Sequence, residues 1–67
     1  MRYYVNKNAQ PNWDHEVHTF SCARLPSEEN RIYLWDFESC WPAKQEAKKY
    51  YKNADWCAHC CSNCHTS

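Results

Sequence analysis

The sequence predicts an α+β domain in which a small three-stranded antiparallel sheet packs on one helix, with a Cys-rich C-terminal loop. Three observations lead to this fold class. Three segments are rich in the aromatic and β-branched residues that favour strands. One later segment carries alanines at helical spacing, and four of the six cysteines lie between residues 57 and 64. A chain of 67 residues makes one domain, which we place at 1–67.

The expected strands occupy residues 2–6, 13–20 and 31–37. The first two are separated by a short polar loop, so they are close enough in sequence to form a hairpin. Within 13–20, side chains alternate between the two faces of the sheet, which places His18 on the face opposite to Val17.

The expected helix runs from residue 41 to about residue 53. Ser39 precedes it as a candidate N-cap, and Pro42 falls in its first turn, where proline is tolerated. Small and aromatic residues recur at spacings of three and four, which predicts one inward face. The residues on this face are Cys40, Ala43, Ala47, Tyr50 and Ala54.

The core that these elements can build is small. Only five residues are Val, Leu or Ile, so aromatic, alanine and cysteine side chains must supply most of the buried surface. Ordering the chain costs roughly 1–2 kcal/mol per residue, which so little aliphatic surface offsets poorly. A metal ion or disulfides are therefore expected on energetic grounds.

Charge and compartment narrow the classes of function. The formal net charge is zero, which argues against a strong nucleic-acid or anionic-membrane partner, and no apolar run could span a bilayer. No secretory signal is visible at the N-terminus. We expect a cytoplasmic protein with reduced thiols, which favours metal over disulfides.

The chain has no glycine, and tryptophan stands where turn chemistry would favour glycine, at Trp13, Trp35 and Trp56. Two interpretations remain open: an engineered or otherwise unusual sequence with Trp at glycine positions, and a natural aromatic-rich protein. The backbone angle φ at the three tryptophans separates them, because negative values at all three would remove the first interpretation.

The cysteines and histidines predict a structural zinc site. Zinc in such sites takes four nitrogen and sulfur ligands, usually from two short chelating pairs on separate segments. His18 and Cys22 form an H-x-x-x-C pair at the end of the second strand, and Cys57 and Cys60 form a C-x-x-C pair at the end of the helix. Neighbouring residues could replace members of this set. These alternative ligands are His59, Cys61, Cys64 and His65.

These motifs carry two resemblances. The run from His18-x-x-x-Cys22 to Cys57-x-x-Cys60 resembles the metal-binding domain of the Ada DNA-repair proteins and related modules in some bacterial nucleases, and it implies a tetrahedral zinc. The first ligand of the Ada domain is a cysteine that accepts a methyl group from DNA. His18 stands at that position here, so the resemblance carries over the metal and not the methyl transfer.

Nearly the whole chain resembles small Cys/His-rich bacterial proteins that share four short segments and imply no particular function. The segments are H-E-V-H at 15–18, N-R-I-Y-L at 30–34, A-K-K-Y-Y at 47–51 and C-H-T-S at 64–67.

Two other chemistries compete with zinc. Cys61-x-x-Cys64-His65 fits the attachment motif of c-type haem, which predicts a monohaem electron carrier as one alternative. The other is a disulfide-stapled protein without metal. Cys40 begins the helix and Cys57 lies beyond its end, about 20 Å away, so these two cannot pair. Cys40 could pair with Cys61 or Cys64 if the tail doubles back along the helix.

An enzyme is not expected. The C-x-x-C pair follows a helix, whereas a thioredoxin-like pair sits at a helix N-terminus, where the helix dipole stabilises the thiolate. The sequence therefore favours a non-enzymatic zinc-binding module that acts as an interaction or accessory domain.

Overall fold

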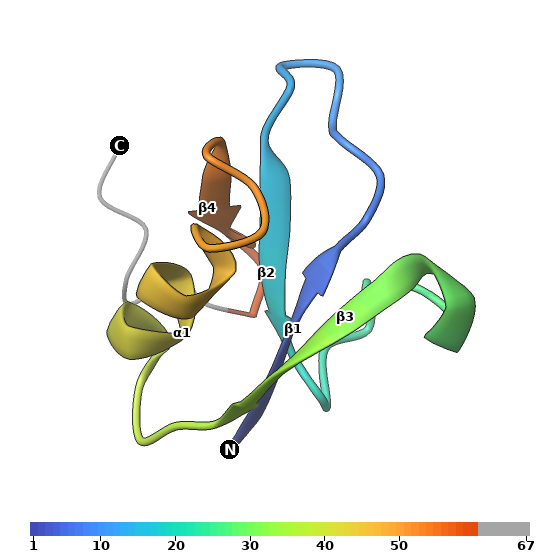
Figure 1. The fold of residues 1–67 in the computed structure, drawn as a ribbon. Helices are drawn as coiled ribbons and strands as arrows, with labels where there is room; N and C mark the ends of the chain where they lie inside the picture. Colours follow the sequence, from blue (N-terminus) through green and yellow to red (C-terminus); the bar gives the residue numbers. More distant parts are fainter. Residues whose placement is uncertain (61–67) are drawn as a thin grey trace.

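The computed structural model describes residues 1–60 of the chain. These residues form four strands, one α-helix and a short 3-10 helix. Figure 1 shows how they are arranged. In chain order these are β1 (Arg2–Asn6), β2 (His15–Thr19), η1 (Glu28–Asn30), β3 (Arg31–Asp36), α1 (Cys40–Ala47) and β4 (Ala54–Trp56). Among the described residues, no helix is long and apolar enough to cross a membrane.

The four strands form one sheet in the order β3-β1-β2-β4. β1 runs antiparallel to both β2 and β3, which confirms the expected hairpin and the antiparallel core of the sheet. β4 pairs with β2 in parallel. The α+β class and the single helix are confirmed, but the expectation of three antiparallel strands was incomplete, because the sheet has a fourth strand and is mixed.

The helix ends earlier than the sequence predicted. α1 stops at Ala47, and the amide of Tyr50 then bonds to the carbonyl oxygen of Ala47, three residues back, in a tight turn. Tyr50 is half exposed and does not belong to the inward face. Ala54 is buried as expected, but in β4.

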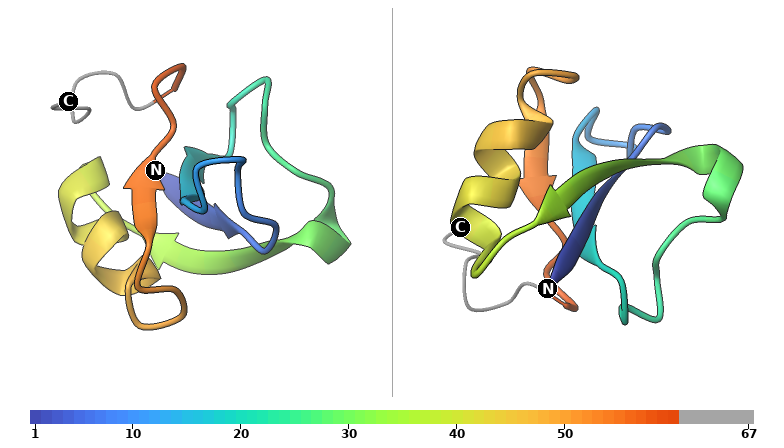
Figure 2. Two further views of the ribbon diagram at one scale, coloured as in Figure 1. Left: turned by 90° about the horizontal axis from the view of Figure 1, so that it is seen from above. Right: turned by 60° about the horizontal axis from the view of Figure 1, so that its bottom comes forward.

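The core lies between α1 and one face of the twisted sheet (Figure 2). Ala43 and Ala47 are fully buried against Val5 and Val17, and small helix side chains allow this close approach. Trp56 closes the core, and its indole Nε1 donates a 2.7 Å hydrogen bond to the carbonyl oxygen of Cys40. Burial of this large ring accounts for a three-residue strand that neither length nor pattern would predict.

Two of the three tryptophans at expected glycine positions have positive φ. Trp13 has a φ of 72° and lies in the turn before β2, where its amide donates a hydrogen bond to the carbonyl oxygen of Gln10. Trp35 has a φ of 145° and lies in β3, beside an irregularity in the pairing of β3 with β1. Both side chains are largely exposed, at 74% and 64%. Trp56 lacks positive φ and is buried. The backbone therefore suits glycine at Trp13 and Trp35 and favours the first interpretation there.

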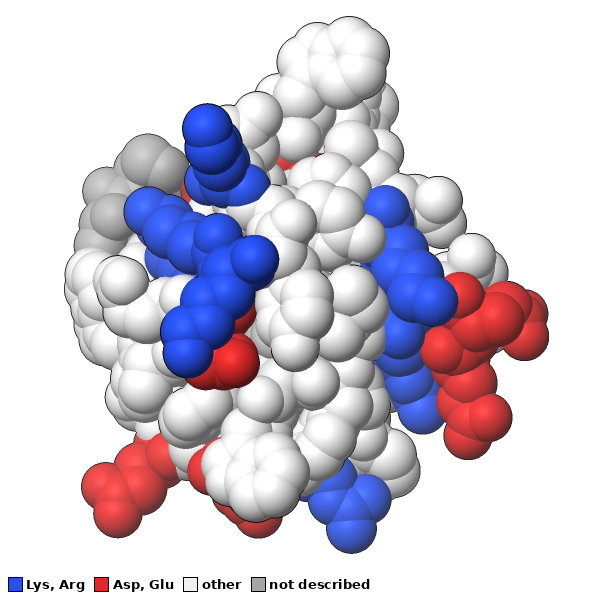
Figure 3. All heavy atoms as spheres, in the orientation of Figure 1, with Lys and Arg blue, Asp and Glu red and all other residues white. Residues whose placement is uncertain are grey.

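The face of the molecule in Figure 3 mixes the two signs of charge. Basic side chains fall into separate groups with acidic side chains beside them. Lys49 Nζ lies 3.0 Å from Glu46, and Lys44 Nζ lies 3.6 Å from Asp55. On this face the acidic groups thus offset much of the positive charge.

Candidate metal centre

The parallel pairing of β2 with β4 places the two chelating pairs together. Val17 is opposite Trp56, and the amide of Cys57 donates a 2.9 Å hydrogen bond to the carbonyl oxygen of Val17. His18 and Cys57 are the next residues along these two strands. Because parallel strands end at the same side of a sheet, the pair that starts at His18 in β2 meets the pair that follows β4.

Each of four side chains contributes one ligand atom to a cluster in which all these atoms lie within 4.8 Å of one another. The four are His18, Cys22, Cys57 and Cys60, the set predicted from the sequence. They could hold a metal ion. One expectation was wrong: the second pair follows β4 rather than the helix, because the chain between α1 and the pair turns back to join the sheet.

The cluster is shielded from solvent. His18 and Cys57 are 1% exposed, Cys22 is buried and Cys60 is half-buried. The sulfurs of Cys22, Cys57 and Cys60 are thiols that are not joined in disulfides. Three thiols and an imidazole packed together, away from water, form a soft donor set of the kind that zinc prefers.

Backbone amides point at two of the sulfurs. The Thr19 amide donates to Cys60 Sγ at 3.4 Å, and the Arg24 amide donates to Cys22 Sγ at 3.4 Å. The turn after β2 orients the second of these amides, since the Cys22 amide bonds back to the Thr19 carbonyl oxygen at 3.1 Å. Such bonds stabilise negative charge on sulfur, as metal binding requires.

The ionisation of the cluster follows from its burial and internal contacts. Burial raises the pKa of Cys22 to about 12, and a hydrogen bond with Cys60 adds to this effect. Burial acts to raise the pKa of Cys60 as well, but hydrogen bonds to its sulfur from Cys22 and Thr19 outweigh it and lower the pKa. Burial, followed by the charge of Arg24, lowers the pKa of His18. His18 is thus neutral at pH 7, the form that binds metals.

The two ring nitrogens of His18 have different surroundings. Nδ1 lies 3.6 Å from Cys22 Sγ and faces the cluster. Nε2 is buried without a hydrogen-bond partner within the part of the chain that the structure describes, and Glu16 Oε1 lies 3.6 Å from it. The geometry therefore offers Nδ1 to a metal. Glu16 was not among the predicted site residues, although strand alternation places it on the same face as His18.

The alternative ligands divide into two groups. His59 is exposed and stands outside the four-residue cluster. The other alternative ligands are Cys61, Cys64 and His65, which lie outside the described residues. The predicted haem motif, which these three residues form, therefore lies outside them too. So does Cys64 as the predicted disulfide partner of Cys40. Cys40 itself is buried at the start of α1, within the core.

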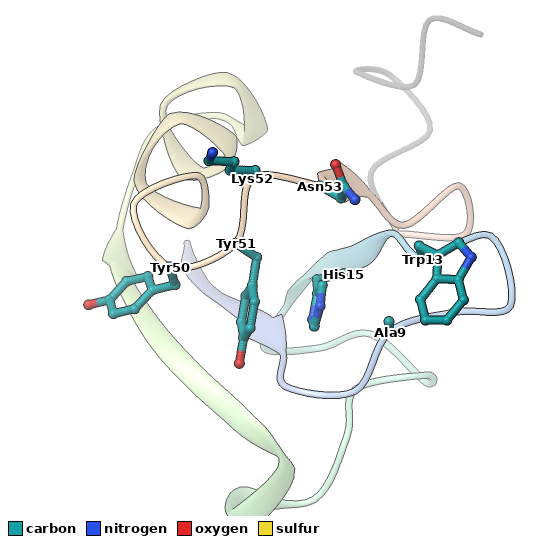
Figure 4. A pocket seen from close by; sticks show the side chains of 7 residues that line it. All are labelled: Ala9, Trp13, His15, Tyr50, Tyr51, Lys52 and Asn53. Atoms are coloured by element: carbon teal, nitrogen blue, oxygen red, sulfur yellow. The ribbon is translucent and has the colours of Figure 1, made fainter.

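A hollow of about 390 Å³ lies at the opposite end of β2 (Figure 4). His15 stacks on Tyr51 inside it, with Trp13 across the opening. The residues that line it are Ala9, Trp13, His15, Tyr50, Tyr51, Lys52 and Asn53. Only His15 among them is a common metal ligand, so this hollow does not resemble a metal site.

Comparison with known proteins finds no relative of this chain. No protein-family model, curated protein or solved structure matches the chain. The resemblance to Ada-type domains stays a prediction, and the case for a metal rests on the geometry of the four side chains.

Proposed function

We propose that this chain is a non-enzymatic module whose fold is stabilised by one structural zinc ion and which serves as an interaction or accessory domain. The observation that carries the proposal is the convergence of four ligand atoms from His18, Cys22, Cys57 and Cys60 within 4.8 Å. A set of three cysteines and one histidine is an established structural zinc set.

The number and the burial of the donors favour a structural role. Catalytic zinc sites keep one position for water or substrate, whereas four protein ligands complete a tetrahedron. His18 and Cys57 are almost completely shielded from solvent, which leaves little room for a substrate. We therefore expect zinc to hold the domain together and not to act on another molecule.

The position of the cluster explains how zinc would support the fold. Cys57 and Cys60 follow the three-residue strand β4, which lies at one edge of the sheet, and Trp56 of that strand closes the core. A metal shared with His18 and Cys22 would fix β4 against β2. In small domains the free energy of metal binding becomes free energy of folding.

Metal analysis tests the proposal. Protein purified without chelator should contain one zinc per chain, and chelation should remove zinc and the folded circular-dichroism signal together. Cys57→Ser should lose both, whereas the matched control Cys61→Ser/Cys64→Ser should keep zinc. A wild-type protein that stays folded without metal, with unchanged thermal stability in Cys57→Ser, would overturn the proposal.

A further inference from the structure

One buried nitrogen of the candidate metal centre has no hydrogen bond in the part of the chain that the structure describes. His18 directs Nδ1 toward Cys22 Sγ, at 3.6 Å. Its other nitrogen, Nε2, has no hydrogen bond among residues 1–60. A histidine that binds a metal through Nδ1 carries its proton on Nε2, so this N–H needs an acceptor. A buried donor left without an acceptor destabilises the folded state.

Glu16 is placed to accept this hydrogen. It lies two residues before His18 on β2, so the two side chains share one face of the sheet. Its Oε1 is 3.6 Å from His18 Nε2, about half an ångström beyond hydrogen-bond range. Gln10 Nε2 donates to the same oxygen at 3.2 Å and holds the carboxylate beside the ring. A small side-chain rotation would close the remaining gap.

We propose that Glu16 is a positioning residue of the metal centre, which accepts the Nε2 hydrogen of His18 and thereby presents Nδ1 to the zinc. The inference rests on the proposed zinc site. The carboxylate fixes the tautomer and the orientation of the imidazole and makes Nδ1 a stronger ligand. Gln10 in turn orients Glu16, so a chain of three side chains leads from the loop before β2 to the metal.

The first test measures zinc affinity by competition with a chromogenic chelator. Glu16→Ala should weaken zinc binding by about 10–100-fold, the usual effect of removing such a partner. Gln10→Ala should weaken it less, because Glu16 remains. Glu28→Ala, which removes an exposed carboxylate from η1, is the matched control and should bind zinc as the wild type does. Equal affinities of Glu16→Ala and the wild type would overturn the inference.

The second test needs no variant to fold. In the zinc-loaded wild-type protein, nitrogen-15 NMR of the histidine rings should show Nδ1 of His18 bound to the metal and a slowly exchanging proton on Nε2. A proton on Nδ1, with zinc bound at Nε2, would overturn the role of Glu16 while leaving the zinc site intact. A wild-type protein that binds no zinc would overturn both proposals.

Discussion

Strand β2 carries a histidine near each end, and the two have opposite surroundings. His15 Nδ1 lies 2.9 Å from the carbonyl oxygen of Asn6, and its ring stacks on Tyr51 with centroids 3.7 Å apart and planes 6° from parallel. His18 has sulfur beside one nitrogen and no hydrogen bond at the other, within the described part of the chain. The hydrogen bond and the stacking account for the position of His15, whereas the metal proposed for the cluster would account for the buried imidazole of His18.

The largest expected loss of zinc and stability comes from replacing His18 with alanine, and the same substitution at His15 is the comparison. His18→Ala removes a ligand and should lose zinc and the cooperative thermal transition. His15→Ala should keep one zinc per chain, because it loses a stacking contact and a hydrogen bond, each worth about 0.5–1.5 kcal/mol, and removes no residue of the four-residue cluster. Zinc content and melting temperature measured side by side check the pair, and equal loss of zinc in both variants would end the distinction between the two histidines.

The next substitution removes the tryptophan beside the candidate metal centre. Trp56, paired with Val17 beside the metal centre, is 2% exposed. Trp56→Gly should destabilise the zinc-loaded protein by at least about 3–5 kcal/mol, because it leaves a cavity in the core. Denaturant unfolding measures this loss, and a loss below about 1 kcal/mol would show that the burial of Trp56 does not hold β4 in place.

Local patterns were sufficient to predict β1, β2, β3 and the start of α1. The spacing of the two Cys/His pairs was sufficient to predict which four side chains come together in the cluster. Local patterns did not predict β4. Its three residues are too few to show a strand pattern, and Ala54 also fits the spacing of a continuing helix. Its pairing with β2 joins segments about forty residues apart, which no short window of sequence contains.

The role of Glu16 was missed for a related reason. A glutamate on a strand usually faces solvent, and nothing in its spacing marks it as special. The structure shows that Nε2 of His18 is buried and needs a hydrogen-bond acceptor. Strand alternation places the Glu16 carboxylate beside it, and this could be recognised only once the packing was known.

Protons should leave the metal centre when zinc binds near neutral pH. Cys22 keeps its proton up to a pKa of about 12 without metal, whereas the pKa of His18 lies below its usual 6.5. Zinc must therefore displace at least the Cys22 proton and none from His18 at pH 7.5, so zinc affinity should rise with pH. Calorimetric titration in two buffers of different ionisation enthalpy counts the protons. A count of zero would contradict the thiolate ligand set.

The smallest expected effect is a gain in stability at the strained tryptophans. Trp13 precedes β2 at the end opposite to the metal, and both Trp13 and Trp35 have positive φ with exposed side chains. Positive φ destabilises the folded state by about 1–3 kcal/mol for a non-glycine residue. Substitution by glycine removes this strain, but glycine also makes the unfolded chain more flexible, which offsets part of the gain in stability. Trp13→Gly and Trp35→Gly should each stabilise the zinc-loaded protein by about 1 kcal/mol. Denaturant unfolding that shows both variants less stable than wild type would contradict the glycine interpretation.

The ligand set itself is the central claim, and X-ray absorption at the zinc edge tests it most directly. For the zinc-loaded Cys61→Ser/Cys64→Ser protein we expect three sulfur ligands at about 2.3 Å and one nitrogen ligand at about 2.0–2.1 Å, the distances typical of structural sites. His18→Ala should remove the nitrogen contribution or the zinc. A first shell with fewer than three sulfurs, or without an imidazole nitrogen, would contradict a centre built from His18, Cys22, Cys57 and Cys60.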